Sequence, residues 1–291
     1  MRRGYLFGLA AYLMWGFFPL YFRLLREAGP AEILAHRIAW SLAFTTLAVV
    51  VARRLRVLAA LARRPRAVAG LALTAVLVAV NWGLFIYGVN SGQVVETSLG
   101  YFINPLVTVL LGVLVQREHL RRRQWIAVGV ATAAVGVLTV DYGRLPWLAL
   151  SLAVTFGLYG LVKKRVGAPA LEGLLVEAAV LTLPAIAYLI WLGPPSHRPL
   201  TWTLLVVSGA ITAVPLTLFA GAANRIPLTA LGLMQYVTPT MHLTLGVAVF
   251  HEPMPPPRLA GFVLVWLALV LLTWDALRNA RRARLVAEPA P

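Results

Sequence analysis

The sequence contains no cysteine and few charged side chains. A chain without cysteine has no disulfide, no thiolate metal site and no cysteine nucleophile. Charged residues make up 12% of the 291 residues, about half of the ~25% that is typical of soluble domains. Because 60% of the residues are hydrophobic and the mean hydropathy is +0.81, too few polar side chains remain to cover a domain of this size. These values exclude a water-soluble globular protein and predict an integral membrane protein.

Acidic residues are particularly scarce, 10 against 26 basic residues, which gives a net charge of +16. Such a charge can indicate nucleic-acid binding. Here, however, the basic residues form short clusters between long apolar runs, as in the cytoplasmic loops of membrane proteins. The sequence also lacks a P-loop, an HExxH motif, a glycine-rich dinucleotide turn and a GxSxG motif. We therefore expect no enzyme activity, no catalytic residue, no metal, no cofactor and no nucleic-acid partner.

Ten segments are apolar enough to cross the bilayer as helices, which takes about 20 residues each. Backbone polar groups must be satisfied internally in the hydrocarbon region, and a helix does this within one segment. We therefore predict an all-α membrane fold with ten transmembrane helices. The predicted spans are 4–22, 31–51, 67–89, 97–115, 125–140, 145–162, 171–192, 201–223, 227–250 and 259–273.

The distribution of basic residues predicts the orientation. If the N-terminus is cytoplasmic, the inside segments hold 20 of the 26 basic residues, the outside segments hold five, and Arg37 lies within a predicted helix. This asymmetry follows the positive-inside rule. We predict a multi-pass protein of the bacterial inner (cell) membrane with both termini in the cytoplasm.

The two halves of the chain resemble each other. Adding 134 to a position in the third to fifth predicted spans gives its counterpart in the eighth to tenth. The informative identities are Asn90 with Asn224, Pro105 with Pro239, and Glu118 with Glu252. Because five spans per half is an odd number, the second copy must enter the membrane from the opposite face, as in many secondary transporters. We divide the chain into a first repeat (1–141), an inverted second repeat (142–277) and a basic cytoplasmic tail (278–291).

Several short strings are more specific than hydropathy. They are EILAHRIAWS at 32–41, NW at 81–82 and LGYFINP at 99–105, followed in the second half by Glu177, QY at 235–236 and PT at 239–240. With these strings, residues 4–277 resemble the EamA-type transporters of the drug/metabolite transporter superfamily, and within them the RarD subfamily.

The resemblance implies alternating access around a central cavity that the first four helices of each half enclose. The fifth and tenth helices would lie at the back, where a second copy of the chain could pack as a homodimer. The implied activity is export of a small organic metabolite, such as an amino acid or a related amphiphile. A drug exporter of the chloramphenicol type is the alternative, because RarD-like proteins carry a name linked to chloramphenicol sensitivity. A membrane-embedded lipid-modifying enzyme that uses His36 and Glu32 is a remote alternative.

Glu32, His36 and Arg37 form the densest cluster of ionisable residues in a predicted span. A charge at the centre of a membrane helix costs about 2.5–3.5 kcal/mol on insertion scales, so such residues are candidates for function. Glu32 and His36 are four residues apart and share a helix face. Arg37 is close enough to the outer end to snorkel. We favour structural ion pairs at an outer gate, with direct substrate contact as the alternative.

Glu177 lies among apolar residues about six positions into the seventh span. An intramembrane carboxylate that gains and loses a proton is what proton-coupled transport requires. We therefore predict a coupling role for Glu177, with a proton as the coupling ion. The alternative is a salt bridge to Lys163, Lys164 or Arg165 at the neighbouring cytoplasmic boundary.

Uncharged polar groups in the fourth and ninth spans suggest a binding surface. Tyr101 and Asn104 are three residues apart and share a face, and Gln235 is the repeat counterpart of Tyr101. A proline shortly after each of these groups removes a backbone donor and frees a carbonyl, which is tolerated where a helix borders a cavity. The alternative is hydrogen bonding between helices. The predicted substrate-binding residues are Tyr101, Asn104, Gln235, Tyr236, Trp15 and Trp82.

Overall fold

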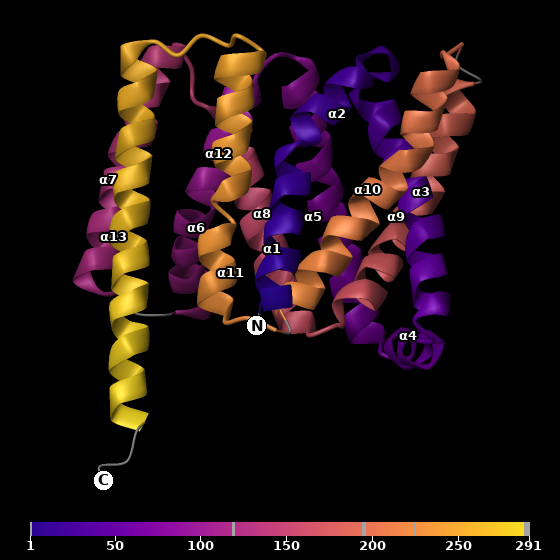
Figure 1. Ribbon diagram of the computed structural model, residues 1–291, viewed down its shortest axis with the longest axis horizontal. Coiled ribbons are helices and arrows are strands. Elements are labelled where there is room, and N and C mark those ends of the chain that lie inside the picture. The colour runs from indigo at the N-terminus through magenta and orange to yellow at the C-terminus, as the bar shows by residue number, and fades with distance from the viewer. Residues whose placement is uncertain (1, 118–119, 194–195, 224, 288–291) are drawn as a thin grey trace.

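The computed structural model describes residues 2–117, 120–193, 196–223 and 225–287. Within these ranges every regular element is helical, as predicted, and the helices form one bundle (Figure 1). The first half contains α1 (Arg2–Gly16), α2 (Phe18–Leu24), η1 (Arg26–Ala28), α3 (Gly29–Val51), α4 (Leu55–Ala62), α5 (Pro65–Asn90), α6 (Val94–Gln116) and α7 (Arg122–Tyr142). The second half contains α8 (Trp147–Val166), α9 (Ala170–Leu192), α10 (Pro199–Ala223), α11 (Leu228–Met234), α12 (Val237–Thr244), the π-helical turn η2 (Leu245–Val249) and α13 (Pro256–Ala287).

Among the described residues, eight helical stretches are long and apolar enough to cross a membrane. They are Arg2–Leu24, Arg26–Val51, Pro65–Asn90, Val94–Val115, Arg122–Tyr142, Ala170–Leu192, Pro199–Ala223 and Pro256–Arg278. The sixth predicted span corresponds to α8, which carries three basic residues in its last turn. The ninth is divided into α11, α12 and η2. Both segments are helical, but neither is among the eight, so the count of ten spans stays a prediction.

Prolines mark the beginnings of several helices. Pro19, Pro30 and Pro65 occupy the first turns of α2, α3 and α5. The fixed φ of proline suits this position, and its missing N–H would have no partner there in any case. Pro19 also separates α1 from α2, so the first predicted span consists of two consecutive helices.

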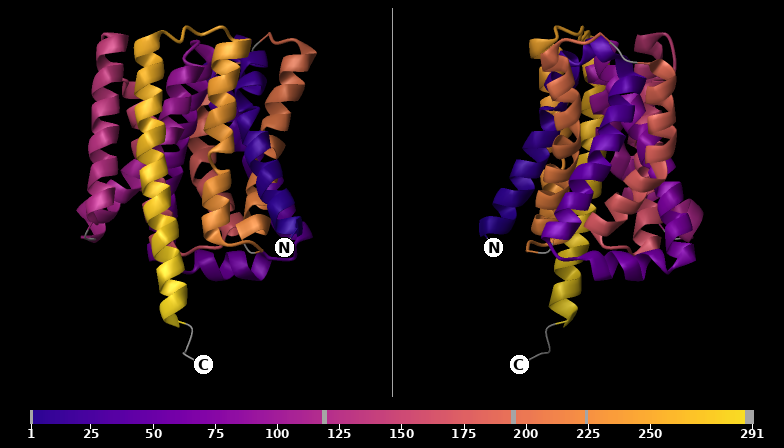
Figure 2. Two further views of the ribbon diagram at one scale, coloured as in Figure 1. Left: turned by 60° about the vertical axis from the view of Figure 1, so that its left-hand side comes forward. Right: turned by 90° about the vertical axis from the view of Figure 1, so that its right-hand side faces the viewer.

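The start of α1 and the end of α13 lie at the same end of the bundle (Figure 1). The short helix α4 lies across this end (Figure 2), within the basic segment between the second and third predicted spans. The last helix, α13, continues beyond the bundle to Ala287. The predicted basic tail is therefore helical through Ala287.

Large apolar side chains cover much of the outer surface. Leu114, Leu183 and Trp191 are each more than 65% exposed, at 68%, 78% and 79%. Lipid tails are the solvent that suits such a surface. At one edge of the bundle α7 and α13 lie side by side (Figure 1), with the small side chains of Ala127 and Ala134 fully buried in a cluster that includes Phe262. Small residues allow membrane helices to approach closely.

A close approach between α3 and α10 positions the site described below. Gly209 of α10 lies against the backbone of Trp40, and a Cβ atom at Gly209 would come within 2.5 Å of the Trp40 carbonyl oxygen. Any side chain at Gly209 would push the helices apart. The contact places Thr212, three residues further along α10, beside the polar residues of α3.

Candidate transport site

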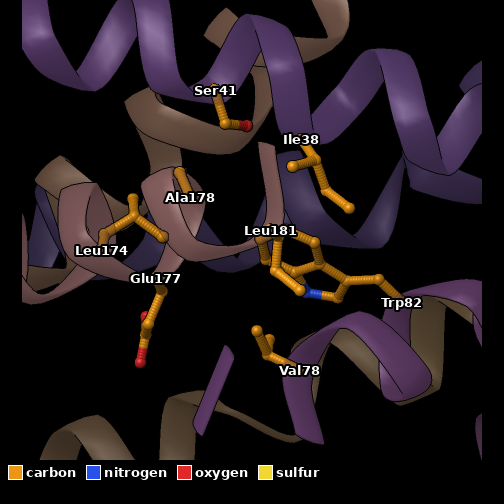
Figure 3. A pocket seen from close by; sticks show the side chains of 8 residues that line it. All are labelled: Ile38, Ser41, Val78, Trp82, Leu174, Glu177, Ala178 and Leu181. Carbon is orange, nitrogen blue, oxygen red and sulfur yellow. The ribbon is translucent and has the colours of Figure 1, made fainter. Parts of the chain in front are cut away.

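A small cavity lies between α3, α5 and α9 (Figure 3). The space open to the centre of a water-sized sphere is about 10 Å³, which is room for about one water molecule. Two buried polar atoms of this lining, Ser41 Oγ and Glu177 Oε2, have no hydrogen-bond partner within the described ranges. The lining residues are Ile38 and Ser41 of α3, Val78 and Trp82 of α5, and Leu174, Glu177, Ala178 and Leu181 of α9. The cavity therefore includes two predicted site residues, Trp82 and Glu177.

Arg37 is buried beside this cavity, with 3% of its surface exposed. Its Nε donates a hydrogen bond to Thr212 Oγ1 at 2.9 Å. Its guanidinium carbon lies 3.9 Å from the centre of the Trp82 ring and about 5.5 Å from the rings of Phe18 and Phe22. A buried cation–π contact contributes about 2 kcal/mol, less than the cost of about 2.5–3.5 kcal/mol for a charge at the centre of a membrane helix. From the sequence we considered that Arg37 could snorkel to the membrane surface. In the structure its side chain is buried in the bundle instead.

Glu32 and His36 lie close together, as their spacing predicts, with Nε2 of His36 4.0 Å from Oε1 of Glu32. The nearer partner of Glu32 is Nε2 of His197, from the segment before α10, at 2.7 Å. Arg37 does not join this group. The prediction that Glu32, His36 and Arg37 form one set of ion pairs is therefore wrong for Arg37. Five residues rotate an α-helix by about 500°, and Arg37 therefore points about 140° away from Glu32.

Glu177 is buried and paired with Lys163, whose Nζ lies 2.5 Å from Glu177 Oε1. The same oxygen accepts a hydrogen bond from Thr74 Oγ1 at 2.5 Å. The salt bridge that the sequence analysis kept as the alternative for Glu177 is therefore present. Its partner is Lys163 rather than Lys164 or Arg165. The pair joins α8 to α9, and Thr74 adds α5.

Tyr101 belongs to an aromatic cluster in the middle of the bundle. Its ring centre lies 5.7 Å from that of Phe85, 5.8 Å from His242 and 6.2 Å from Phe156. Its hydroxyl donates a long hydrogen bond, 3.4 Å, to Asn81 Oδ1. These contacts place Tyr101 between α5, α8 and α12.

Asn104 and Asn81 hold helices together. Asn104 Nδ2 donates to the carbonyl of Ala153 at 3.1 Å, and Asn81 Nδ2 donates to the carbonyl of Leu152 and to Thr155 Oγ1, both at 3.0 Å. All three acceptors belong to α8. The amide of Asn104 thus makes the interhelical hydrogen bond that we kept as the alternative to cavity lining.

Gln235 and Tyr236 lie at the break between α11 and α12. Tyr236 packs against the apolar cluster of α6, α7 and α13, whereas Tyr101 packs against the cluster that contains Phe22 and Phe85. The structure therefore does not bring Tyr236 together with Tyr101 around one cavity. The break changes the helix direction, and side-chain positions extrapolated from a straight helix no longer hold.

Trp15 links the break to the aromatic cluster through His242, a residue to which the sequence analysis assigned no role. His242 is buried, and its Nε2 lies 3.0 Å from the carbonyl oxygen of Trp15. The Trp15 ring packs against Tyr12 and Phe219. An ionisable residue inside a predicted span is itself a signal of function, and this signal could have identified His242.

Polar contacts join helices at both ends of the bundle. At the end opposite the termini, Glu252 accepts hydrogen bonds from the backbone N–H groups of Val94 and Val95 at 2.7 and 2.8 Å. Negative charge at a helix N-terminus is stabilising, because it satisfies free N–H donors and the helix dipole. Further ion pairs at this end are Arg144–Glu96 and Arg258–Asp141, and those at the terminus end are Arg54–Glu172 and Arg121–Asp275.

Comparison with known proteins identifies the family. A model of the EamA-like transporter family matches residues 2–140 and, a second time, residues 145–274. The chain belongs to the EamA-like transporter family. Protein RarD of Streptomyces exfoliatus, a relative of this EamA protein, is 52% identical over 295 residues, which cover 99% of this chain and 94% of that protein. The uncharacterized transporter YojE of Bacillus subtilis is 39% identical over 291 residues and covers 97% of both chains.

A solved crystal structure has the same fold as this EamA protein. It aligns with a TM-score of 0.59 at 22% sequence identity and covers 95% of this chain and 98% of the solved chain. The family match and the relatives confirm the resemblance that the sequence strings indicated, including RarD. This EamA protein is a multi-pass membrane transporter, and relatives such as YojE are named as transporters.

Proposed function

We propose that this EamA-family protein is a secondary transporter that exports a small organic metabolite, such as an amino acid or a related amphiphile. The observation that supports this proposal best is the small buried cavity beside Arg37 and Trp82, with ion pairs at both ends of the bundle. In an alternating-access cycle, such a cavity would open to one face of the membrane at a time. The helices around it must separate to admit a metabolite, because the present cavity holds about one water molecule.

In this proposal the ten helical segments form two inverted repeats of five, with both termini in the cytoplasm. The double match of the family model supports the division near residue 141. The basic residues at the terminus end of the bundle support its assignment to the cytoplasm. Two positions of the sequence repeat, Glu118 and Asn224, lie outside the described residues.

We propose that the broken ninth segment, which consists of α11, α12 and η2, moves during transport. Discontinuous helices line the substrate sites of many secondary transporters, because free backbone groups are tolerated where they border a cavity. At the break, Tyr12 donates a hydrogen bond to the carbonyl of Leu231 at 3.1 Å, and Thr238 donates to the carbonyl of Tyr12 at 2.9 Å. Both hydrogen bonds connect α1 with the broken ninth segment. We assign the binding surface to Trp15, Trp82 and Tyr101, and Gln235 and Tyr236 lie at the break instead.

Glu177 remains our candidate for coupling to a proton. Glu177 is one of the residues that line the cavity, and its carboxylate is held by Lys163 and Thr74. Protonation of Glu177 would remove its attraction to Lys163 and release the contact between α8 and α9. The proton would thereby bias the equilibrium between two arrangements of these helices.

Reconstitution in liposomes tests the proposed function. Labelled amino acids and chloramphenicol are screened for counterflow, with and without a pH gradient. Counterflow of a small organic metabolite, with accumulation driven by the gradient, is expected. Movement of chloramphenicol alone would favour the drug-exporter alternative, and absence of any counterflow would contradict the proposal.

A further inference from the structure

Arg37 differs from the buried carboxylates that the structure describes. Each of the five buried carboxylates has a basic partner within 4 Å, namely His197, Arg144, Arg54, Lys163 or Arg121. Arg37 is the buried cation, and no carboxylate among the described residues lies within this distance of it. A buried charge is costly unless an opposite charge pairs with it. We therefore looked for a place where a negatively charged group could bind Arg37.

The contacts of the guanidinium show where a counter-charge would fit. One face of the planar group lies over the Trp82 ring, and Thr212 accepts one hydrogen bond from Nε. An arginine side chain has five N–H donors, and four of them are on the two terminal nitrogens. Within the described ranges these nitrogens have no hydrogen-bond acceptor. The aromatic rings therefore cover the faces of the group and leave its edge unsatisfied.

We propose that the edge of the Arg37 guanidinium binds the carboxylate of the transported solute. This inference rests on the proposed transport function and adds the substrate class to it. A carboxylate matches the two terminal nitrogens of arginine with parallel hydrogen bonds, and stacking on Trp82 is kept when it binds. Trp82 also borders the cavity, so a solute carboxylate at Arg37 would have its remaining atoms beside the cavity-lining residues. The transporter thus selects small organic anions or zwitterions over neutral compounds.

The charge preference is tested first on the wild-type protein. Proteoliposomes are assayed for counterflow of each of the twenty proteinogenic amino acids in labelled form, and of 3-phenylpropionate as a carboxylate without an amine. The primary amide of each transported compound is then added as a competitor. The amide keeps the shape of the acid and removes its negative charge. We expect it to compete at least about tenfold more weakly than the acid, because the charge-assisted bidentate contact is lost.

Substitutions then separate a binding role from a structural one. Arg37→Met removes a charge that has no carboxylate partner to leave unpaired, so the empty protein is expected to keep its Tm. The affinity for the transported carboxylate should fall at least about tenfold. Arg258→Met is the matched control, because Arg258 is paired with Asp141 at 2.8 Å between α13 and α7. This control should lower the Tm by leaving Asp141 unpaired and should keep the preference for acid over amide.

If Arg37→Met gives too little protein, Arg37→Lys replaces it. Lysine keeps the charge but loses the planar fork, so a weaker preference for acid over amide is expected. Equal competition by acid and amide, or unchanged carboxylate affinity in these variants, would overturn the inference. Transport of chloramphenicol alone, insensitive to Arg37→Met, would also overturn it and would favour the drug-exporter alternative. Transport of neutral metabolites in preference to carboxylates would overturn it while leaving the proposed transport function intact. If no compound moves at all, the proposed function fails and the inference fails with it.

Discussion

At the residue scale, the Lys163–Glu177 pair shows how a buried carboxylate is tolerated in this bundle. The Lys163 side chain is 19% exposed, and that of Glu177 is 1% exposed. Removal of the lysine leaves Glu177 charged and almost completely buried, which generally costs about 3–5 kcal/mol. We expect Lys163→Met to lower the free energy of unfolding by about 3 kcal/mol, measured by thermal or denaturant unfolding in detergent.

The neighbouring Lys164 provides the control for this prediction. Lys164 is exposed, and Lys164→Met should change the stability by less than about 0.5 kcal/mol, as is usual for exposed sites. The double substitution Lys163→Met, Glu177→Leu should recover most of the loss, because no unpaired charge remains. Equal effects of the two single lysine substitutions would show that the pair does not stabilise the fold.

The coupling role of Glu177 makes a second prediction at this scale. Glu177→Gln keeps the shape of the side chain and removes the exchangeable proton. We expect gradient-driven accumulation in proteoliposomes to be lost while equilibrative exchange continues. Wild-type transport that is indifferent to a pH gradient and to an uncoupler would contradict a proton-coupled mechanism.

At the scale of helices, the approach of α10 to α3 depends on Gly209. Gly209→Ala places a methyl group against the backbone of Trp40, and backbone atoms cannot move aside as a flexible side chain would. Overpacking of this kind typically costs about 1–3 kcal/mol. We therefore expect a lower Tm, together with weaker carboxylate binding, because Thr212 moves away from Arg37.

A glycine in an open position is the matched control. A Cβ atom at Gly129 of α7 would meet nothing within 4 Å. Gly129→Ala should leave the Tm unchanged or raise it slightly, because alanine favours helix formation by about 1 kcal/mol over glycine. If Gly209→Ala and Gly129→Ala behave alike, the α3–α10 contact is looser than the structure indicates.

At the scale of the whole molecule, the orientation can be tested directly, because the chain has no cysteine of its own. Single cysteines at Arg64 and Arg122 should react with an impermeant thiol reagent from the cytoplasmic side alone. Cysteines at Gly92 and Ser196 should react from the outside alone. Labelling of any of the four from the opposite face would show that the ten-span topology with cytoplasmic termini is wrong.

The sequence predicted the features that depend on local composition and spacing. Hydropathy identified the eight apolar spans and the helical class, because a segment in lipid must satisfy its backbone within itself. The spacing of Glu32 and His36 predicted their proximity, since four residues make about one helical turn. The strings around residues 32–41 and 99–105 indicated the family that the comparisons confirmed.

The tertiary structure decided which side chains from distant segments meet. His197 is 165 residues from Glu32, and Thr212 is 175 residues from Arg37. No local pattern encodes such contacts, because they depend on how α10 packs against α3. The same packing leaves the edge of Arg37 without a carboxylate. The sequence therefore predicted a charged group within a membrane span, and the packing of the helices determined that, among the described residues, no carboxylate lies beside it.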